Sequence, residues 1–350
     1  MTKPIKAVSL LSGGLDSMLA TKVIQDQGIH VEAINFFTGF CVEGHTHAIR
    51  KQDQEKQKRN NALWVAEQLG IKLHIIDVIE EYKQVVLNPK HGYGAYMNPC
   101  LDCKMFMVSR AKEWAKANGF DFIITGEVIG QRPMSQLKTK MQQVAEESQS
   151  EDILLRPLSA KNLPPTKPEQ NGWVNREELF GFNGRNRSGQ QIPLAKKYGF
   201  KDYSTPAGGC CFLTNPHYAN KLKDLWENRP GQKDYDFDDI MLLKVGRHLR
   251  PKAHFKLIIG REEGENRYLN GYKQQFIAIT VDSHPGPLAL VDGTLKDVDD
   301  EHLAGQIMAR YSQGKDQPAV TITIHYPNKT QRTFDATPLT PEQIDQSWQV

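Results

Sequence analysis

The sequence predicts an α/β protein with a doubly wound parallel sheet, followed by a smaller β-rich or α+β domain. In the first half, short apolar runs with β-branched residues alternate with segments of helical period. Glycines stand where several of the helical segments should end. From about Tyr235 onward, short β-rich runs separated by turns replace this alternation. Strand–helix alternation is typical of a parallel sheet covered by helices on both faces.

The elements of the first half follow one another in order. Strands are expected at four apolar runs: Lys6–Leu11, Val31–Phe37, Lys72–Val78 and Phe120–Thr125. Helices are expected at three segments that each precede a glycine: Leu15–Gln27, Asn60–Leu69 and Ser109–Asn118. Because ligands in such sheets bind beyond the carboxyl ends of the strands, the connections after these strands are the candidate site.

The second half divides differently. Residues 160–190 are rich in Pro, Gly, Asn and Arg, so we expect a functional or mobile segment rather than core. A helix over Lys221–Glu227 should end at Asn228, before Pro230. We therefore expect one domain over 1–230, with an irregular segment at 160–215, and an accessory domain over 235–350.

The composition is that of an ordinary globular protein, with 39% hydrophobic residues and a formal net charge of +3. No apolar run approaches the roughly 20 residues that cross a bilayer, so no membrane partner is expected. Five cysteines without an export signal favour reduced thiols and a cytoplasmic protein rather than a disulfide framework. A dimer is compatible with the sequence.

The strongest local pattern is Ser12-Gly13-Gly14-Leu15-Asp16-Ser17, between a predicted strand and a predicted helix. The glycines let the backbone approach an anion, and the following helix presents its N–H groups. Ser12 and Ser17 add hydroxyl donors, and Asp16 is suited to hold Mg²⁺ beside a phosphate. The Walker pattern is absent, so a conventional γ-phosphate-cleaving loop is not supported.

This hexapeptide resembles the PP-loop of the ATP pyrophosphatase superfamily, whose fold is the adenine nucleotide alpha hydrolase-like domain. Members adenylate a carbonyl or carboxyl oxygen and release pyrophosphate, so the resemblance implies ATP and Mg²⁺. It also implies that Asn35, Phe36 and Phe37 lie beside adenine, although plain core packing explains those aromatics equally.

The cysteines form a second pattern. Cys100 and Cys103 make a C-x-x-C, and the distant Cys210 offers a third thiol. Three cysteines suit a [4Fe–4S] cluster with one open iron. A zinc ion would take a fourth ligand from Cys211, His45 or His47, and a redox disulfide between Cys100 and Cys103 is the third reading.

Three blocks resemble tRNA thiolation enzymes. Asn98–Lys104 is similar to their N-P-C-x-x-C-N segment, Thr125–Gln136 to T-G-E-x-x-G-Q-x-x-S-Q, and Pro206–Leu213 to P-A-G-G-C-L-L-T. Cysteine at position 100, where persulfide-type 2-thiouridylases carry Asp, implies the cluster-dependent branch, with Cys210 as ligand and Cys211 as its substitute. The resemblance implies tRNA as substrate, sulfide or a persulfide-carrying protein as sulfur donor, and Gly126 and Gln131 at the ATP site.

Other residues keep two interpretations each. Arg185 and Arg187 belong to a stretch that resembles G-R-S-R-x-x-Q, so they either contact phosphate of the tRNA or ATP, or form a flexible basic loop. Cys41 is either a persulfide carrier or a small packed residue. The cations of Arg50–Arg59 form a solvated helix face or touch RNA, and those of Lys244–Arg267 fit an accessory RNA-binding module.

The sequence thus favours ATP-dependent tRNA uridine thiolation. Two rivals remain: a PP-loop ligase that transfers nitrogen, with a structural zinc, and a non-catalytic RNA-binding protein that keeps a nucleotide pocket.

Overall fold

The computed structural model describes residues 4–42, 60–204, 210–229 and 233–350. The described residues form two compact units, which divide between Thr214 and Asn215. The helix α9 (Pro216–Asn228) therefore belongs to the second unit. Within the described residues, no helix is both long and apolar enough to cross a membrane.

The first unit contains a parallel five-stranded sheet in the order β3-β2-β1-β4-β5. The strands are β1 (Lys6–Leu10), β2 (His30–Phe37), β3 (Leu73–Asp77), β4 (Phe122–Thr125) and β5 (Leu154–Leu155). From β1 the chain adds β2 and β3 on one side and β4 and β5 on the other. The strand order therefore reverses between β1 and β4, which is where such sheets bind ligands. The predicted fold class is confirmed.

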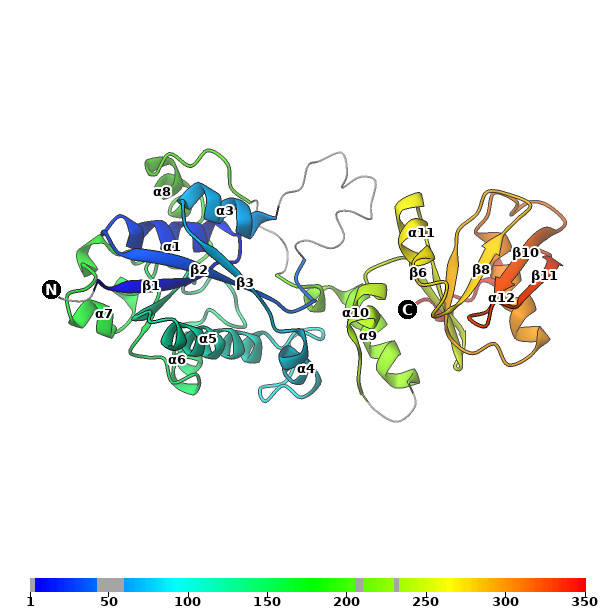
Figure 1. The fold of residues 1–350 in the computed structure, drawn as a ribbon, viewed down its shortest axis with the longest axis horizontal. Helices are drawn as coiled ribbons and strands as arrows, with labels where there is room; N and C mark the ends of the chain where they lie inside the picture. Colours follow the sequence, from blue (N-terminus) through cyan, green and yellow to red (C-terminus); the bar gives the residue numbers. More distant parts are fainter. Residues whose placement is uncertain (1–3, 43–59, 205–209, 230–232) are drawn as a thin grey trace. The chain divides into compact units, whose positions relative to one another are not determined.

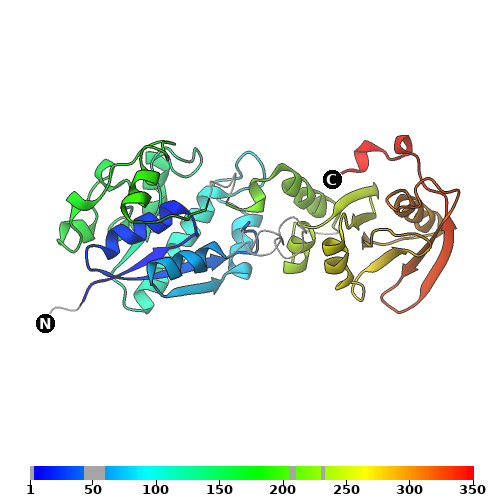
Figure 2. The same cartoon turned by 90° about the horizontal axis from the view of Figure 1, so that it is seen from above.

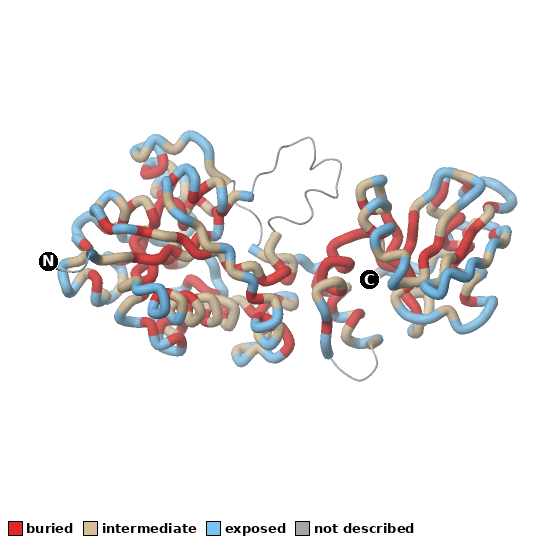
Figure 3. Tube along the Cα trace, viewed as in Figure 1, coloured by how far each residue is buried: buried red, intermediate tan, exposed pale blue. Residues whose placement is uncertain are grey.

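Helices cover both faces of this sheet (Figure 1). One face carries α1 (Leu15–Gln25), α3 (Asn61–Leu69) and α8 (Gln191–Lys197). The other carries α4 (Ile79–Leu87), α5 (Cys100–Ala117) and α6 (Lys138–Glu147). The buried strands and the inner sides of these helices appear in red in Figure 3, and Figure 2 shows the same elements turned by 90°.

Helix α5 begins nine residues before the helix predicted at Ser109–Asn118. The backbone N–H of Cys103 bonds the carbonyl of Pro99 at 2.8 Å, so Cys100 and Cys103 lie on the first helical turn rather than in a tight turn. Buried Leu101, Met105 and Val108 continue the helical period toward the N-terminus. The predicted helix starts too late because the C-x-x-C was interpreted as a tight turn.

The segment 160–190 is not excluded from the core, contrary to the expectation. Val174 and Leu179 are 2% exposed and join the cluster that packs α1 against the sheet. Short helical turns organise this segment: η1 (Ala160–Asn162), α7 (Lys167–Gln170) and η2 (Arg176–Glu178). Its prolines and glycines shape turns between buried anchors, so composition alone was misleading.

The second unit contains an antiparallel six-stranded sheet in the order β11-β10-β8-β9-β7-β6. Its strands are β6 (Arg247–Lys252), β7 (Phe255–Ile259), β8 (Ile277–Val281), β9 (Ala289–Gly293), β10 (Val320–His325) and β11 (Gln331–Ala336). Alternate residues face α12 (Val298–Arg310) on one side and α10 (Phe237–Leu242) with α11 (Glu263–Asn270) on the other. The predicted β-rich or α+β character is confirmed.

Candidate nucleotide and thiol site

The loop between β1 and α1 has the form of a phosphate site. Gly13 has φ +75°, and Gly14 caps α1 in an extended conformation. A Cβ on Gly13 would lie 2.7 Å from the backbone nitrogen of Ala62, so only glycine fits against α3. The Ser17 hydroxyl donates to the Gly14 carbonyl at 2.9 Å and lies 3.3 Å from the Ser12 hydroxyl. No described side chain caps α1, so the backbone N–H groups at its start are able to bind an anion.

Gly126, directly after β4, is packed against the same helix start. A Cβ there would lie 2.4 Å from the backbone nitrogen of Ser17 and 2.6 Å from the backbone carbonyl oxygen of Asp16. Contacts that close to backbone atoms exclude every side chain. The loops after β1 and β4 therefore meet at the point where the strand order reverses.

Asp16 is the acidic group of this loop. One carboxylate oxygen, Oδ2, accepts from the Gln131 amide at 3.1 Å, whereas Oδ1 is buried and has no hydrogen-bond partner among the described residues. Burial raises the pKa of Asp16, and the Gln131 bond and the nearby Arg187 oppose that rise. An unpartnered buried carboxylate oxygen is suited to coordinate Mg²⁺. The fully buried Gln191 side chain lies close enough to the Asp16 carboxylate to lower its pKa.

Arg185 and Arg187 both contact this region. Arg187 donates to the Ser204 carbonyl at 2.7 Å, and the Ser204 hydroxyl donates to the Gly13 carbonyl at 3.1 Å. Arg185 donates to the carbonyl of Gln131 at 3.1 Å. Arg187 therefore lies beside the phosphate loop, while Arg185 fixes the loop that follows β4.

A buried charge group lies behind these loops. Glu127 is 2% exposed and accepts from Thr125 at 2.9 Å and from the 6%-exposed Arg156 at 3.1 Å. The Lys104 ammonium lies 3.7 Å from its other oxygen. Burial raises the pKa of Glu127, but Lys104 and Arg156 outweigh it and hold that pKa below its ordinary value. Glu127 thereby links the carboxyl ends of β4 and β5 to α5, which carries the C-x-x-C.

The cysteines gather at the same edge of the sheet. Cys100 accepts from the buried Asn98 amide at 3.2 Å, and Cys103 lies against the hydroxyl of buried Tyr82 on α4. Cys210 and Cys211 lie within hydrogen-bonding range of each other and close enough to the first pair to affect its charge. All five cysteines of the chain are free thiols.

The thiols differ strongly in acidity. The hydrogen bond from Cys211, assisted by Arg132 and Lys104, lowers the pKa of Cys210 to about 5. Burial and the neighbouring Cys210 raise the pKa of Cys103 to about 12. Cys210 is therefore more acidic than Cys103, and it is also exposed.

A metal centre was expected here. The donor atoms are three thiol sulfurs with no carboxylate among them, and thiolate sulfur is the ligand that iron–sulfur clusters use. Among the described residues, however, no three His, Cys, Asp or Glu side chains stand in an arrangement that would hold a metal ion. His45, His47, the cations of Arg50–Arg59 and Pro206–Gly209 lie outside the described residues.

Arg132 connects the two halves of the site. Its positive charge lowers the pKa of Asp16 at the phosphate loop and also that of Cys210 in the thiol group. One side chain thus lies near both the phosphate loop and the most acidic thiol. Sequence reasoning missed Arg132, Glu127, Arg156 and Gln191. Only Glu127 had a signal, since it stands in the T-G-E block.

Phe36 is 7% exposed on β2, and the Asn35 amide donates to the carbonyl of Leu11 at 2.8 Å. Both positions agree with core packing at the end of the strand, and contact with adenine stays a prediction. Cys41 lies just beyond the same strand, and its backbone pairs with that of Cys211 in a short antiparallel β-bridge.

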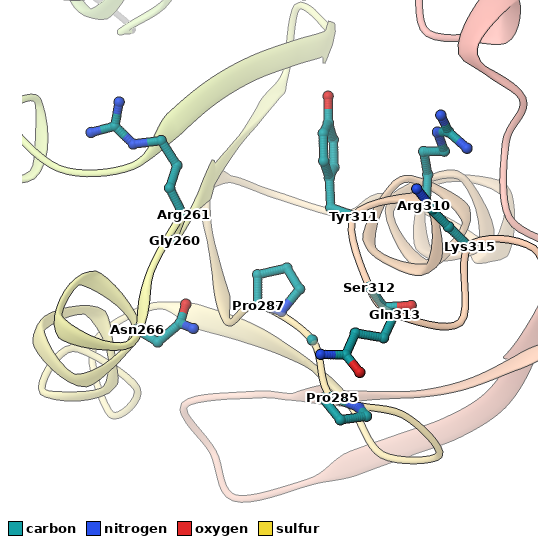
Figure 4. A pocket seen from close by; sticks show the side chains of 11 residues that line it. Gly260, Arg261, Asn266, Pro285, Pro287, Arg310, Tyr311, Ser312, Gln313 and Lys315 are labelled. Atoms are coloured by element: carbon teal, nitrogen blue, oxygen red, sulfur yellow. The ribbon is translucent and has the colours of Figure 1, made fainter. Parts of the chain in front are cut away.

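The second unit has a basic cavity of its own, with a volume of about 630 Å³ (Figure 4). Arg261 stands on one side, Arg310 and Lys315 on the other, and Gln313 and Pro287 lie between them. A smaller cavity in the first unit is lined by Gly28–Glu32 and Gly70–Lys72, at the amino ends of β2 and β3, and so lies away from the phosphate loop.

Comparison with known proteins agrees with this division. Residues 5–167 match the family model described as the tRNA methyl transferase HUP domain, and residues 246–349 match the NFACT protein RNA binding domain.

Three curated relatives are tRNA-specific 2-thiouridylases. MnmA of Mesoplasma florum is 25% identical over 293 residues, which cover 79% of this chain and 72% of the relative. MnmA 3 of Phocaeicola vulgatus is 30% identical over 200 residues, covering 53% and 50%. MnmA of Campylobacter concisus is 29% identical over 129 residues, covering 36% and 35%. The chain thus spans half or less of the last two relatives.

Among solved structures, a 4-thiouridine synthetase–RNA complex with bound ATP is 20% identical, with a TM-score of 0.33 over 57% of this chain and 54% of that chain. The C-terminal part of a fibronectin/fibrinogen-binding protein from Streptococcus suis is 15% identical, with a TM-score of 0.26 over 47% and 80%. Likeness at this level carries no argument about function.

Proposed function

We propose that this chain, a PP-loop protein that resembles the tRNA thiouridine synthases, uses ATP to replace a uridine carbonyl oxygen of tRNA by sulfur. The observation that carries the proposal is the position of Arg132, near both Asp16 and Cys210. A site that only hydrolyses or binds ATP has no need of thiols beside the phosphate loop. The 2-thiouridylase names of the relatives and the RNA binding domain model support tRNA as the substrate.

The first step is adenylation. The uridine oxygen attacks the α-phosphorus of ATP, an oxygen–phosphorus bond forms, and the bond to pyrophosphate breaks. The N–H groups at the start of α1 and the Ser12 hydroxyl bind the phosphates, while the Ser17 hydroxyl is held by the Gly14 carbonyl. Asp16 would hold Mg²⁺, which would offset the charge that develops at the phosphorus, and the cations Arg187 and Arg132 lie close enough to Asp16 to contribute to the same end.

The second step exchanges oxygen for sulfur. Hydrosulfide attacks the activated ring carbon, a carbon–sulfur bond forms, and AMP departs with the former carbonyl oxygen. Water must be kept from the adenylate. Gly126 and Gly13 pack directly against the backbone of α1 and α3, so no side chain separates the loop from these helices.

Cys100, Cys103 and Cys210 are the residues that would hold a [4Fe–4S] cluster, with Cys211 as the substitute for Cys210. When bound, the cluster would supply an open iron that keeps hydrosulfide available beside the adenylate. The role of the chain's own residues is to orient these thiols. Asn98 holds Cys100, Tyr82 holds Cys103, and Lys104, fixed by Glu127, favours the thiolate of Cys210.

Two measurements test the proposal. Nucleoside mass spectrometry of tRNA from cells that lack the protein should show the loss of one thionucleoside, and an unchanged set would contradict thiolation. Anaerobically purified protein should contain iron and acid-labile sulfide that are lost in Cys100→Ala. Stoichiometric zinc without iron would overturn the cluster while leaving the thiolation reaction open.

A further inference from the structure

Two thiols that the proposed reaction does not require face each other across a short antiparallel pairing. Cys41 follows β2, and Cys211 precedes η3 (Phe212–Thr214). The flanking backbone bonds run from Phe212 N–H to the Phe40 carbonyl at 2.9 Å and from Val42 N–H to the Cys210 carbonyl at 3.5 Å. These two bonds enclose the cysteine pair without using its own N–H groups, which makes it a non-hydrogen-bonded pair.

That type of pair matches disulfide geometry. Opposite residues in a non-hydrogen-bonded pair have Cα atoms about 4.5 Å apart and side chains on the same face. Disulfides form at Cα separations of about 4.4–6.8 Å. Cys41 and Cys211 are free and only partly buried, so a small disulfide can reach them. We propose that Cys41 and Cys211 are a redox-modification site, which closes to a cross-strand disulfide by exchange with a low-molecular-weight disulfide.

The exchange is balanced with oxidised glutathione as the oxidant. The two protein thiols give one protein disulfide, the glutathione disulfide bond breaks, and two molecules of reduced glutathione leave with the two protons. The new bond ties the end of β2 to the segment that carries Cys210. It also withdraws Cys211 as a substitute ligand and leaves Cys100, Cys103 and Cys210 as the remaining thiols.

Peptide mapping tests the pairing directly. Trypsin places Cys41 in residues 23–50, Cys100 and Cys103 in residues 91–104, and Cys210 with Cys211 in residues 202–221. The metal-free full-length protein is equilibrated with oxidised glutathione, alkylated and digested without reduction. We expect peptide 23–50 joined to peptide 202–221, minus two hydrogens, and a decrease from five titratable thiols to three.

The variants make the result specific. Cys41→Ser and Cys211→Ser should each abolish the joined peptide, whereas Cys210→Ser and Cys100→Ser should keep it. Fragmentation of the wild-type peptide locates the bonded sulfur even if a variant fails to fold. Joining of peptide 91–104 to either of the others, or glutathione adducts alone, would overturn the proposal.

An independent observation concerns the basic cavity of the second unit, and this inference rests on the proposed tRNA substrate. Arg310 and Lys315 form no ion pair within 4.0 Å of a described residue, although Arg310 lies close enough to Glu342 to lower the pKa of that carboxyl. Arg261, opposite them, is held by Glu265, which accepts from its Nη2 at 2.6 Å and its Nε at 3.1 Å. Glu265 is 1% exposed, so this carboxylate fixes the guanidinium rather than repelling a ligand from solvent.

Two glycines of the cavity wall leave room for neighbouring side chains. A Cβ on Gly260 would lie 2.1 Å from the Asn266 side-chain oxygen, and one on Gly286 would lie 2.8 Å from Val281. Cations on two sides of a cavity with polar walls fit a chain of phosphates better than an apolar ligand. We infer that this cavity binds the phosphodiester backbone of RNA.

The test is fluorescence anisotropy of labelled tRNA with the full-length protein over a range of salt concentrations. Arg310→Gln with Lys315→Gln removes two phosphate contacts, so the slope of log affinity against log salt should fall by about 1.4 to 1.8. Affinity at low salt should fall about tenfold or more. Lys329→Gln, an exposed cation on the turn between β10 and β11, is the matched control and should change neither quantity.

The outcomes separate the two ideas. An unchanged slope in the double variant would overturn the cavity as the RNA site. Failure of the wild-type protein to bind tRNA at all would instead contradict the proposed substrate.

Discussion

The buried pair of Glu127 and Arg156 offers a quantitative test of the architecture behind the site. Removing one partner of a buried ion pair leaves an uncompensated charge, which typically costs about 3–5 kcal/mol. Glu127→Gln leaves Arg156 without a carboxylate partner, and Arg156→Met leaves Glu127 with the Thr125 hydroxyl and the Lys104 ammonium, 3.7 Å away. We expect each single variant to lose about 3 kcal/mol or more of unfolding free energy.

The double variant should lose less than the two single changes together. With both charges gone, the main remaining loss is the hydrogen bond from Arg156 to the Met141 carbonyl. Leaving that carbonyl without a donor should lower the free energy of unfolding by about 1–3 kcal/mol. The coupling between the two sites should therefore be about 3 kcal/mol. Urea denaturation measures it, and hydrogen exchange of the β4 and β5 amides assigns the transition to the first unit. Additive losses would refute the buried-pair argument.

The same pair predicts a pH dependence with a defined sign. The pKa of Glu127 is lower in the folded chain than its ordinary value of 4.5. Its contribution to stability is therefore present above pH 4.5 and is lost as the pH falls toward the folded pKa. In Arg156→Met the folded pKa should rise, so the difference in stability from the wild type should shrink on acidification. A difference that grows below pH 4.5 would contradict the assignment.

Three further predictions concern the site itself. Asp16→Asn should abolish AMP formation while leaving thermal stability equal or higher, because it removes a carboxylate whose pKa burial has raised; a loss of stability seen by calorimetry would contradict this. Gly126→Ala should lower the free energy of unfolding by about 1–3 kcal/mol, because its Cβ meets the backbone of α1. In Gly14→Ala the new Cβ makes only an ordinary 3.5 Å contact, so stability should change little, while ATP binding measured by calorimetry should weaken. Iodoacetamide at pH 6 should alkylate Cys210 and spare Cys103, whose pKa values are about 5 and about 12, and equal labelling by mass spectrometry would refute the difference.

The first unit could be predicted from the sequence because its signals are local. Apolar runs and terminal glycines give β1, α1, β2 and α3 within a few residues. The start of α5 was missed because Pro99 and the two cysteines suggested a turn, although Pro99 precedes the first helical turn, where proline is tolerated.

The site was predictable only where it depends on contiguous motifs. The phosphate loop was placed correctly between β1 and α1, since Gly13 and Gly14 act locally. The positions of Arg132 and Gln191 relative to Asp16 depend on the packing of α8 and the loop after β4, which no short pattern encodes. Likewise, the pairing of Cys41 with Cys211 joins segments 170 residues apart and is visible only in three dimensions.

The most direct test of the central claim combines purified protein with ATP, Mg²⁺, sulfide and tRNA, and counts AMP and thionucleoside together. The account predicts that AMP and pyrophosphate form only when tRNA is present, with one AMP for each thiouridine. In Cys100→Ala, AMP should still form while the thionucleoside is lost. Formation of ADP in place of AMP, or of AMP at the same rate without tRNA, would contradict the adenylation of a tRNA uridine by this site.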